Sequence, residues 1–291
     1  MGIKIILKYK KDKIMEQVLR NKDGLTEKEF LKKYNPGDYK RPSVTADIMV
    51  IGMDKHFSNL KLLLIKRSDH PFINKWALPG GFINDNETAY QAAARELEEE
   101  TGLKNVYLDQ IYTFTKPRRD PRTWVMSIAY MALVQNLETV KGMDDAADAA
   151  WFDLIFNDDA LILFNSERNV EIKYNLKSKT FKNGILSYQN YVPIHETGFE
   201  KIAFDHVEII IESLIKLRNE FLYSNKAFCL VPDEFTLPEL QKVYEVVLGQ
   251  KLYKKSFRDI VKNKVLETGY EKKSQIKSGR TSKIYKYLEE K

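Results

Sequence analysis

The sequence is poor in the residues that build several common kinds of site. It holds a single cysteine, Cys229, which excludes a disulfide framework and indicates a reducing compartment. No elbow motif surrounds a serine, so a Ser-His-Asp hydrolase has no support. The histidines follow no zinc-ligand spacing, and we assign no catalytic role to any of them: His56, His70, His195 and His206.

Long hydrophobic runs are also missing. The basic start MGIKIILKYKKDK has too short an apolar stretch for a signal peptide, and no segment offers the roughly eighteen uncharged apolar residues of a membrane span. No internal repeat or low-complexity tract is visible. We therefore expect a soluble cytoplasmic protein, and a length of 291 residues predicts two domains.

Charge is present in abundance but is distributed unevenly. The net charge is +6, yet the stretch from Lys251 to Lys286 alone holds twelve Lys and Arg residues against three acidic ones. The densest acidic cluster lies far away, from Glu96 to Glu100. This separation indicates two sites with different partners.

Hydrophobic patterning predicts strands before and after a single helix, which is typical of the α+β class. Strand-like runs begin at Val44 and Leu60, and a helix is expected from about Glu87 to Glu100 with Gly102 as its C-cap. Two more apolar runs, NVYLDQIYTFT and WVMSIAYMALV, flank the basic turn KPRRDPRT. Before them, a Thr26 capping box opens a short helix that Asn35-Pro36-Gly37 ends.

The second half of the chain predicts a hairpin, a long helix and a domain boundary. Alternating apolar residues from Val170 and the turn Asn183-Gly184 indicate a hairpin insertion over about 155–200. Helical spacing runs from Ile202 to about Leu222, where Asp205 is expected as the cap, and Pro232 breaks the pattern that follows. We expect an N-terminal extension over 1–40, one domain over 41–223 and a second over 234–291.

The acidic cluster requires a countercharge. Glu96, Glu99 and Glu100 stand at i, i+3 and i+4, so a helix would project all three from one face. A hard divalent cation such as Mg²⁺ or Mn²⁺ would relieve their repulsion, and the Pro79-Gly80-Gly81 turn would let the backbone approach it. Arg95 could orient a carboxylate. The alternative is a solvated acidic face, which is common in Glu-rich helices.

The surrounding spacing favours the metal site. From Gly81 the chain has five residues, Glu87, seven residues, then Arg95-Glu96-Leu97-x-Glu99-Glu100-x-Gly102-Leu103. This pattern resembles, at every specified position, the Nudix box of the MutT-like Nudix hydrolases. The resemblance implies an α/β/α sandwich around a mixed sheet, and hydrolysis of a nucleoside diphosphate linked to another group with Mg²⁺ or Mn²⁺.

The same resemblance implies roles for the residues of the box. It implies that Glu96, Glu99 and Glu100 are metal ligands, with a carbonyl from Gly80, and that Arg95 and Glu87 support them in the catalytic site. The general base in such enzymes is a box glutamate or an acidic residue of a distant loop. Here that loop offers Asp144, Asp145 and Asp148, which could equally be an ordinary polar turn. We favour a box glutamate.

The basic turn predicts the substrate class. Arg118, Arg119 and Arg122 could bind phosphate, and Tyr112, Phe114 or Trp124 could stack on a base, although an ordinary surface hairpin is the alternative. The turn is similar to the Arg-Asp-Pro-Arg turn of the ADP-ribose-handling branch of the family, which includes regulators of NAD metabolism. The resemblance implies ADP-ribose or a related metabolite.

The basic C-terminal segment predicts a winged helix-turn-helix. A Thr236–Glu239 capping box opens one helix that Gly249 closes, and Ser256 with Asp259 is expected to open a second, FRDIVKNKVLE. A basic turn and a strand follow, as in the winged helix of Nudix-type regulators, which the segment resembles. A basic face for dimer contacts or solubility is the alternative. The candidate DNA-binding residues are Lys254, Lys255, Arg258, Lys262, Lys277 and Arg280.

Two functional classes therefore remain. Because every position of the box is present, we favour a Nudix hydrolase with a C-terminal module that binds double-stranded DNA. The alternative is an ADP-ribose-responsive transcriptional regulator with little or no catalysis. A homodimer is expected in either case, since readers of two-fold DNA sites are usually dimers.

Overall fold

The computed structural model describes residues 19–135, 137, 146–183, 186–273, 276 and 281–288. The chain divides into two compact units at the Arg41–Pro42 bond. The first unit holds helix α1 (Glu27–Lys33) and a short 3-10 helix, η1 (Pro36–Asp38). The capping box predicted at Thr26 is confirmed, since its hydroxyl accepts the Glu29 N–H and the Glu29 carboxylate accepts the Thr26 N–H.

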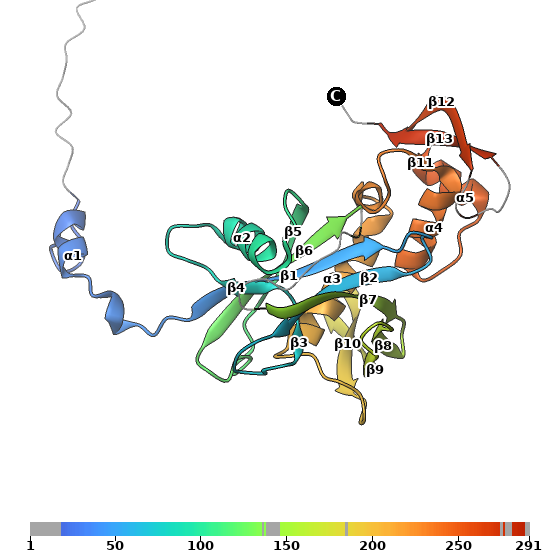
Figure 1. Cartoon of the computed structure of the whole chain (residues 1–291). Helices are drawn as coiled ribbons and strands as arrows, with labels where there is room; N and C mark the ends of the chain where they lie inside the picture. Colours follow the sequence, from blue (N-terminus) through green and yellow to red (C-terminus); the bar gives the residue numbers. More distant parts are fainter. Residues whose placement is uncertain are drawn as a thin grey trace, which may run out of the picture. The chain divides into compact units, whose positions relative to one another are not determined.

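In the described part of the chain, the second unit is built on a ten-stranded mixed sheet (Figure 1). Its order is β10-β9-β8-β7-β2-β1-β6-β5, with β3 on β2 and β4 on β1. Only the β1–β6 pair is parallel among these strands. The strands are β1 Ser43–Met53, β2 Leu60–Arg67, β3 Trp76–Ala77, β4 Gly80–Phe82, β5 Tyr107–Phe114, β6 Val125–Val134, β7 Ala146–Phe156, β8 Ala160–Asn165, β9 Val170–Asn183 and β10 Leu186–His195.

Helices cover both faces of this sheet, as the expected sandwich requires. Ile48 and Val50 of β1 share a core with α2 (Ala89–Thr101). Met49 and Ile51 point to the opposite face, where they share a core with α3 (His206–Phe221). Strand β1 is therefore apolar on both sides, which explains its continuous hydrophobic run. Near the start of β1, the polar residues Thr45 and Asp47 line a pocket instead.

The predicted hairpin is confirmed as a strand pairing, because β9 and β10 pair antiparallel from Asn183 and Leu186 onward. It belongs to the main sheet, which β8, β9 and β10 extend from β7 by successive antiparallel pairs. Gly184 lies outside the described residues. The long helix begins at His206, directly after the predicted cap position Asp205. The helical spacing that starts at Ile202 is not helix before that point, because the Ala203 N–H donates to the Trp76 carbonyl and Phe204 adopts a positive φ of 53°. None of the helices in the described part of the chain has the length and apolar character to span a bilayer.

The C-terminal segment forms the predicted winged helix. Helix α4 (Leu237–Leu248) begins at the Thr236–Glu239 capping box and ends at Gly249, whose φ is 67°. A short 3-10 helix, η2 (Lys226–Leu230), precedes it, and α5 (Lys254–Val261) follows it. Three strands pair in the order β11-β13-β12. They are β11 Phe235–Thr236, β12 Val265–Lys273 and β13 Thr281–Tyr287.

The predicted bounds of the second helix of this module were wrong at both ends. Helix α5 starts at Lys254 after Tyr253, so Ser256 is not its cap. It ends at Val261, because Val265 already pairs with Tyr287 in the wing. Val265, which was expected on the apolar face of the helix, therefore belongs to β12. Its pairing partner Tyr287 lies much further along the chain, so no local pattern predicts the pairing.

Candidate functional site

A pocket of about 420 Å³ lies near the start of β1, between the start of β4, helix α2, the β5–β6 turn and the segment before α3. Its walls combine carboxylates, guanidinium groups and aromatic rings. The lining includes the side chains of Asp47, Arg67, Phe82, Arg95, Glu96, Glu100, Arg119, Arg122, Phe204 and His206.

Helix α2 starts two residues later than predicted. Its N-cap is Thr88, whose hydroxyl accepts the Gln91 N–H while the Gln91 side chain accepts the Thr88 N–H. This Thr88–Gln91 capping box is a local signal in the sequence that marks the true start of the helix. Glu87 consequently lies outside the helix, where its carboxylate accepts the Asn84 N–H at 2.9 Å. Gly102 is the C-cap, as predicted, with φ of 79°.

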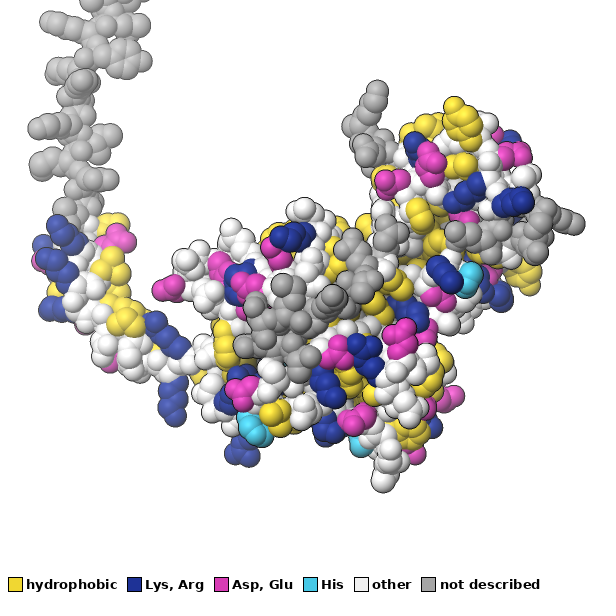
Figure 2. Space-filling view, viewed as in Figure 1, with side chains coloured by type: hydrophobic (Ala, Val, Ile, Leu, Met, Phe, Trp, Pro, Cys, Tyr) yellow, Lys and Arg dark blue, Asp and Glu magenta, His cyan; other side chains and the backbone are white. Residues whose placement is uncertain are grey.

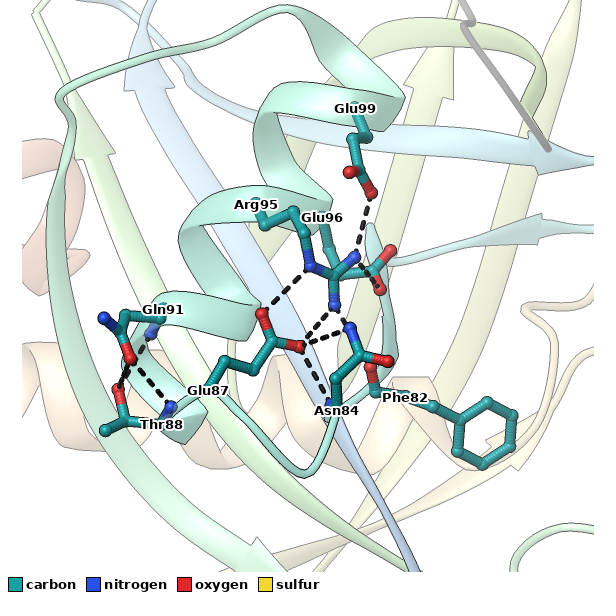
Figure 3. Close-up of polar contacts among 8 residues, drawn as sticks. All are labelled: Phe82, Asn84, Glu87, Thr88, Gln91, Arg95, Glu96 and Glu99. Carbon is teal, nitrogen blue, oxygen red and sulfur yellow. Dashed lines mark hydrogen bonds and ion pairs between the residues drawn. The ribbon is translucent and has the colours of Figure 1, made fainter.

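Arg95 holds the acidic side chains of the box together (Figure 3). Its guanidinium lies 2.7 Å from Glu87, 2.8 Å from Glu96 and 2.9 Å from Glu99. Hydrogen bonding to Arg95 lowers the pKa of Glu87 to about 2. The same contacts raise the pKa of Arg95, so one cation already balances part of the charge that prompted the metal hypothesis.

Glu100 lies apart from Arg95 and is deeply buried. Its side chain belongs to a residue only 7% exposed, and its carboxylate accepts the Gly80 N–H at 2.7 Å. Burial raises the pKa of Glu100 to about 8, and the neighbouring Glu96 and Asp47 add to this effect. Burial also raises the pKa of Glu96. These two carboxyl groups thus share a site with too little positive charge to hold both ionised.

Two glycines allow this close packing. A Cβ atom on Gly80 would lie 2.2 Å from the Ala46 carbonyl oxygen, and φ of Gly80 is 149°. A Cβ atom on Gly81 would lie 2.2 Å from Oε1 of Glu96. The backbone therefore needs glycine at Gly80, whereas a side chain at Gly81 would displace the Glu96 carboxylate from its position.

The donor set of this pocket fits a hard divalent cation. Glu96 and Glu100 supply carboxylate oxygens, the ligands that Mg²⁺ and Mn²⁺ prefer, and an added cation would favour their ionised forms. Glu99 does not line the pocket, and its side chain is 43% exposed. Among the described residues, no three acidic, His or Cys side chains already converge as a metal site. The structure thus brings three of the four predicted ligands to the pocket, namely Glu96, Glu100 and Gly80.

The predicted substrate-binding residues of the basic turn separate in the structure. Arg119 lines the pocket, but its side chain is only 4% exposed and its Nε and Nη2 atoms lie 3.0 and 2.7 Å from the Asp205 carboxylate. Arg118, with φ of 62°, lines a neighbouring cavity instead. Tyr112 and Phe114 line a third cavity beside α3. These last three residues therefore lie away from the box glutamates, and their role in substrate binding stays a prediction.

Arg122 of the same turn lines the pocket together with residues from other segments. The Arg122 guanidinium lies 5.1 Å from the ring centre of Phe82 and 5.8 Å from that of Phe204. The Arg67 guanidinium lies 5.0 Å from the same Phe204 ring and donates to the Pro71 carbonyl at 2.7 Å. Arg67, Phe82 and Phe204 come from distant segments. No local motif marks them, so the sequence did not predict them as site residues.

The back wall of the pocket is a buried polar group around Asp47. Asp47 accepts a hydrogen bond from the Ser127 hydroxyl and lies 3.7 Å from Nη2 of Arg119. His206 accepts the Leu78 N–H on Nδ1 at 3.0 Å, and burial lowers the pKa of His206. His206 is therefore a neutral residue that fixes the backbone before β4.

The alternative general bases are not at this pocket. Asp148 lies in β7 and forms an ion pair with Arg168, at 2.6 Å between carboxylate and Nε, which lowers the pKa of Asp148. It does not line the pocket. Asp144 and Asp145 lie outside the described residues.

A second candidate site is the basic surface of the winged helix. Three lysines of the wing pair with carboxylates at 2.8 to 3.1 Å: Lys272 with Glu239, Lys283 with Glu267 and Lys286 with Glu234. Figure 2 shows this module with acidic and basic side chains mixed on its surface. The basic residues at α5 are exposed and form no ion pair within the described residues: Lys254, Lys255, Arg258 and Lys262. Lys277 and Arg280 lie outside the described residues.

The raised pKa of the buried Glu100 predicts how the stability of the metal-free protein depends on pH. Because its pKa rises from 4.5 to about 8 on folding, the folded protein keeps a proton that the unfolded chain loses between these values. The resulting stabilisation is complete below the lower value and is lost as pH rises through about 8. We expect the free energy of unfolding, measured with urea and a chelator, to fall over this window.

Glu100→Gln should remove most of that fall, and Glu96 should account for a remainder because its pKa shifts in the same direction. The matched control is Glu98→Gln, which changes an exposed glutamate on the same helix that pairs with Lys104. An identical pH profile in the Glu100 variant and the unmodified protein would contradict the prediction.

Two family profiles match the chain. The NUDIX domain profile matches residues 41–163, and the profile of the NrtR DNA-binding winged helix domain matches residues 227–287. The first covers β1 through β7, including the box helix, and the pocket residues except Phe204 and His206. The second spans η2 and both helices of the C-terminal module.

Individual proteins resemble one or both parts. The ADPR responsive transcriptional repressor NtrR of Acinetobacter baylyi is 28% identical over 267 residues, 90% of this chain and 88% of the repressor. The ADP-ribose pyrophosphatase of Methanocaldococcus jannaschii is 41% identical over 130 residues, 45% of this chain and 72% of that enzyme. A crystal structure of a MutT/nudix family protein from Enterococcus faecalis is 31% identical, with a TM-score of 0.72 over 91% of this chain and 94% of that one.

Proposed function

The chain belongs to the MutT/Nudix family, and from this premise we propose that it hydrolyses a nucleoside diphosphate-linked substrate of the ADP-ribose class with the aid of Mg²⁺ or Mn²⁺. The observation that carries the proposal is the pair of buried carboxyl groups, Glu96 and Glu100, in one pocket with Arg67 and Arg122. The name of the Methanocaldococcus relative supports ADP-ribose as the substrate.

In this proposal Glu96 and Glu100 hold the cation, because both face the pocket. Arg95 orients Glu96 and also pairs with Glu99, while the Gly80 N–H orients Glu100. When bound, the cation supplies positive charge to the diphosphate and makes a water molecule more acidic. A glutamate of this set would serve as the general base toward the attacking water.

The arginines and aromatic rings of the pocket bind the rest of the substrate. Arg67 and Arg122 are held in place by the Pro71 carbonyl and by Asp120, and we assign them to the diphosphate. The rings of Phe82 and Phe204 offer flat surfaces for the base or ribose. A volume of about 420 Å³ is in the range of ordinary small-molecule sites.

Kinetics of two arginine variants test this assignment. We expect Arg122→Ala to raise the KM for ADP-ribose by about tenfold or more with a smaller change in kcat, because it removes a charge-assisted contact to the bound substrate. Arg118→Ala is the matched control, since Arg118 belongs to the same turn but lines the neighbouring cavity. A larger KM effect for Arg118 than for Arg122 would reverse the assignment.

A second function is supported by the C-terminal module. The winged-helix profile, and similarity to the Acinetobacter repressor across both parts of the chain, support an ADP-ribose-responsive DNA-binding regulator. The unpaired basic residues of α5 fit a DNA backbone, and a homodimer would present two such helices to a two-fold site. In this proposal one chain both senses and destroys its ligand.

Two assays on the same preparation test the proposal. The first measures release of AMP from ADP-ribose with Mg²⁺. The second measures a mobility shift with duplex DNA from the region upstream of the gene that encodes this chain. Turnover without duplex binding would leave a hydrolase only. Duplex binding that ADP-ribose weakens, without turnover, would leave the regulator only.

A further inference from the structure

We propose that α3 couples ligand occupancy of the pocket to the position of the DNA-binding helix, with the Arg119–Asp205 ion pair at its pocket end and Arg218 at its winged-helix end. This inference rests on the proposed ligand and DNA functions. It adds the physical link between them, which lies in a helix outside both the Nudix box and the winged helix.

The pocket end of α3 is held by buried charges. Asp205 is the N-cap of α3 by position, but its carboxylate makes no capping hydrogen bond. It pairs instead with Arg119, at 2.7 and 3.0 Å. The next residue, His206, lies in the pocket wall and holds the Leu78 N–H. The start of α3 is therefore fixed by pocket residues rather than by its own cap.

Arg119 is also positioned to respond to an anion. Its Nη2 atom lies 2.7 Å from Asp205 and 3.7 Å from Asp47, so two carboxylates already share one guanidinium. A diphosphate in the pocket would compete with Asp205 for that guanidinium. A cation beside Glu100 and Asp47 would weaken the attraction between Asp47 and Arg119. Both changes act on the residue where α3 begins.

The other end of α3 holds the winged helix. Arg218 donates from Nε to the Val247 carbonyl at 3.0 Å, near the C-terminus of α4. It also donates from Nη2 to the Phe156 carbonyl at 2.6 Å, at the end of β7. A Cβ atom on Gly249 would lie 3.3 Å from Nη2 of Arg218, so the C-cap of α4 is packed against this side chain. One half-buried arginine thus joins α3, the sheet and α4.

A chain of aromatic contacts continues from α3 to the DNA-binding helix. The ring centre of Phe221 lies 5.0 Å from that of Tyr244 in α4. Tyr244 in turn lies 5.8 Å from Phe257 in α5, the helix that carries the exposed basic residues. A rise of 1.5 Å per residue puts Asp205 and Arg218 about 20 Å apart along α3. A shift of this rigid helix would therefore move α4 and α5 together.

The packing around this link leaves polar groups unpaired. Within the described residues, the hydroxyl groups of Ser213 in α3 and Tyr244 in α4 are buried without a hydrogen-bond partner. Such groups destabilise the arrangement in which they are found. The free-energy difference between this position of α3 and one that pairs the two hydroxyl groups is therefore smaller. A small difference of this kind is what a ligand needs to shift the population of α3 positions.

The test measures the coupling directly. In the full-length protein with Ca²⁺ in place of Mg²⁺ to slow turnover, the Kd for upstream-region duplex is measured with and without saturating ADP-ribose. We expect ADP-ribose to raise the Kd by about tenfold or more in the unmodified protein. In Arg218→Ala we expect the ratio to fall to within about twofold of one, while ADP-ribose alone and duplex alone still bind.

Lys216→Ala is the matched control. Lys216 lies on the same helix but contacts Asp109 and the Gln110 carbonyl rather than α4. The control should keep the coupling of the unmodified protein. Equal coupling in Arg218→Ala and the unmodified protein would overturn the inference while leaving both binding functions intact. Failure of the unmodified protein to bind either partner would instead count against the proposed function.

Hydrogen exchange supplies a readout without DNA. We expect ADP-ribose with Ca²⁺ to change the exchange rates of amides at 247–249 in the unmodified protein, and this change to be absent in Arg218→Lys. The lysine variant keeps the positive charge and loses the paired donation to the Val247 and Phe156 carbonyls, so it serves if the alanine variant does not fold. An unchanged exchange rate at 247–249 in ligand-bound, unmodified protein would overturn the inference.

Discussion

Glu100→Gln is expected to lower kcat for ADP-ribose by about 10² to 10⁴. Gln has nearly the same shape, and its amide oxygen can still accept the Gly80 N–H, so the turn before α2 should keep its position. The variant loses the buried negative charge that would hold a cation or take a proton. Steady-state kinetics with Mg²⁺, beside calorimetric titration of Mn²⁺ into the substrate-free protein, separate these losses.

Glu98→Gln is the control for that experiment. Glu98 stands between box glutamates, but its side chain is 50% exposed and pairs with Lys104. We expect its kcat and Mn²⁺ affinity to remain within about twofold of the unmodified protein, as for most surface substitutions. Activity of Glu100→Gln equal to that of the control would mean that the acidic cluster is only a solvated face. In that case the regulator would be the better description of the chain.

The second large effect expected is the dependence of DNA affinity on salt. If each exposed basic residue at α5 contacts one phosphate, the four side chains give a slope of log affinity against log salt of about −3.6 per module. A fourfold rise in salt then weakens binding by about 10². Fluorescence anisotropy with upstream-region duplex at several salt concentrations measures the slope.

Single substitutions assign the contacts. Arg258→Ala or Lys262→Ala should each flatten the slope by about 0.9. Lys283→Ala is the control, since Lys283 already pairs with Glu267 in the wing and displaces fewer counterions. Arg280, which lies outside the described residues, is predicted from the sequence to behave like Lys262. Binding that is insensitive to salt, or equal effects for Lys262 and Lys283, would rule out α5 as the main phosphate-binding surface.

Local sequence by itself determined the elements whose signals lie within one or two turns of chain. The box helix, its Gly102 cap, the Thr26 and Thr236 capping boxes and the paired strands at Val44 and Leu60 all follow from short-range hydrogen bonding and periodicity. The helical spacing of the glutamates also places Glu96 and Glu100 on adjacent turns. These features depend on neighbours only a few residues away.

Only the tertiary structure decided which side chains meet in the pocket. Arg118 and Arg119 are adjacent in sequence, yet Arg118, with its positive φ, lines the neighbouring cavity, while Arg119 lines that cavity and reaches the pocket as well. Arg67 and Phe204 come together because β2 and the segment before α3 end at the same edge of the pocket. Burial of Glu100, and hence its raised pKa, likewise depends on the turn from β4 that packs over it. Such contacts follow from the path of the whole chain, which no local pattern records.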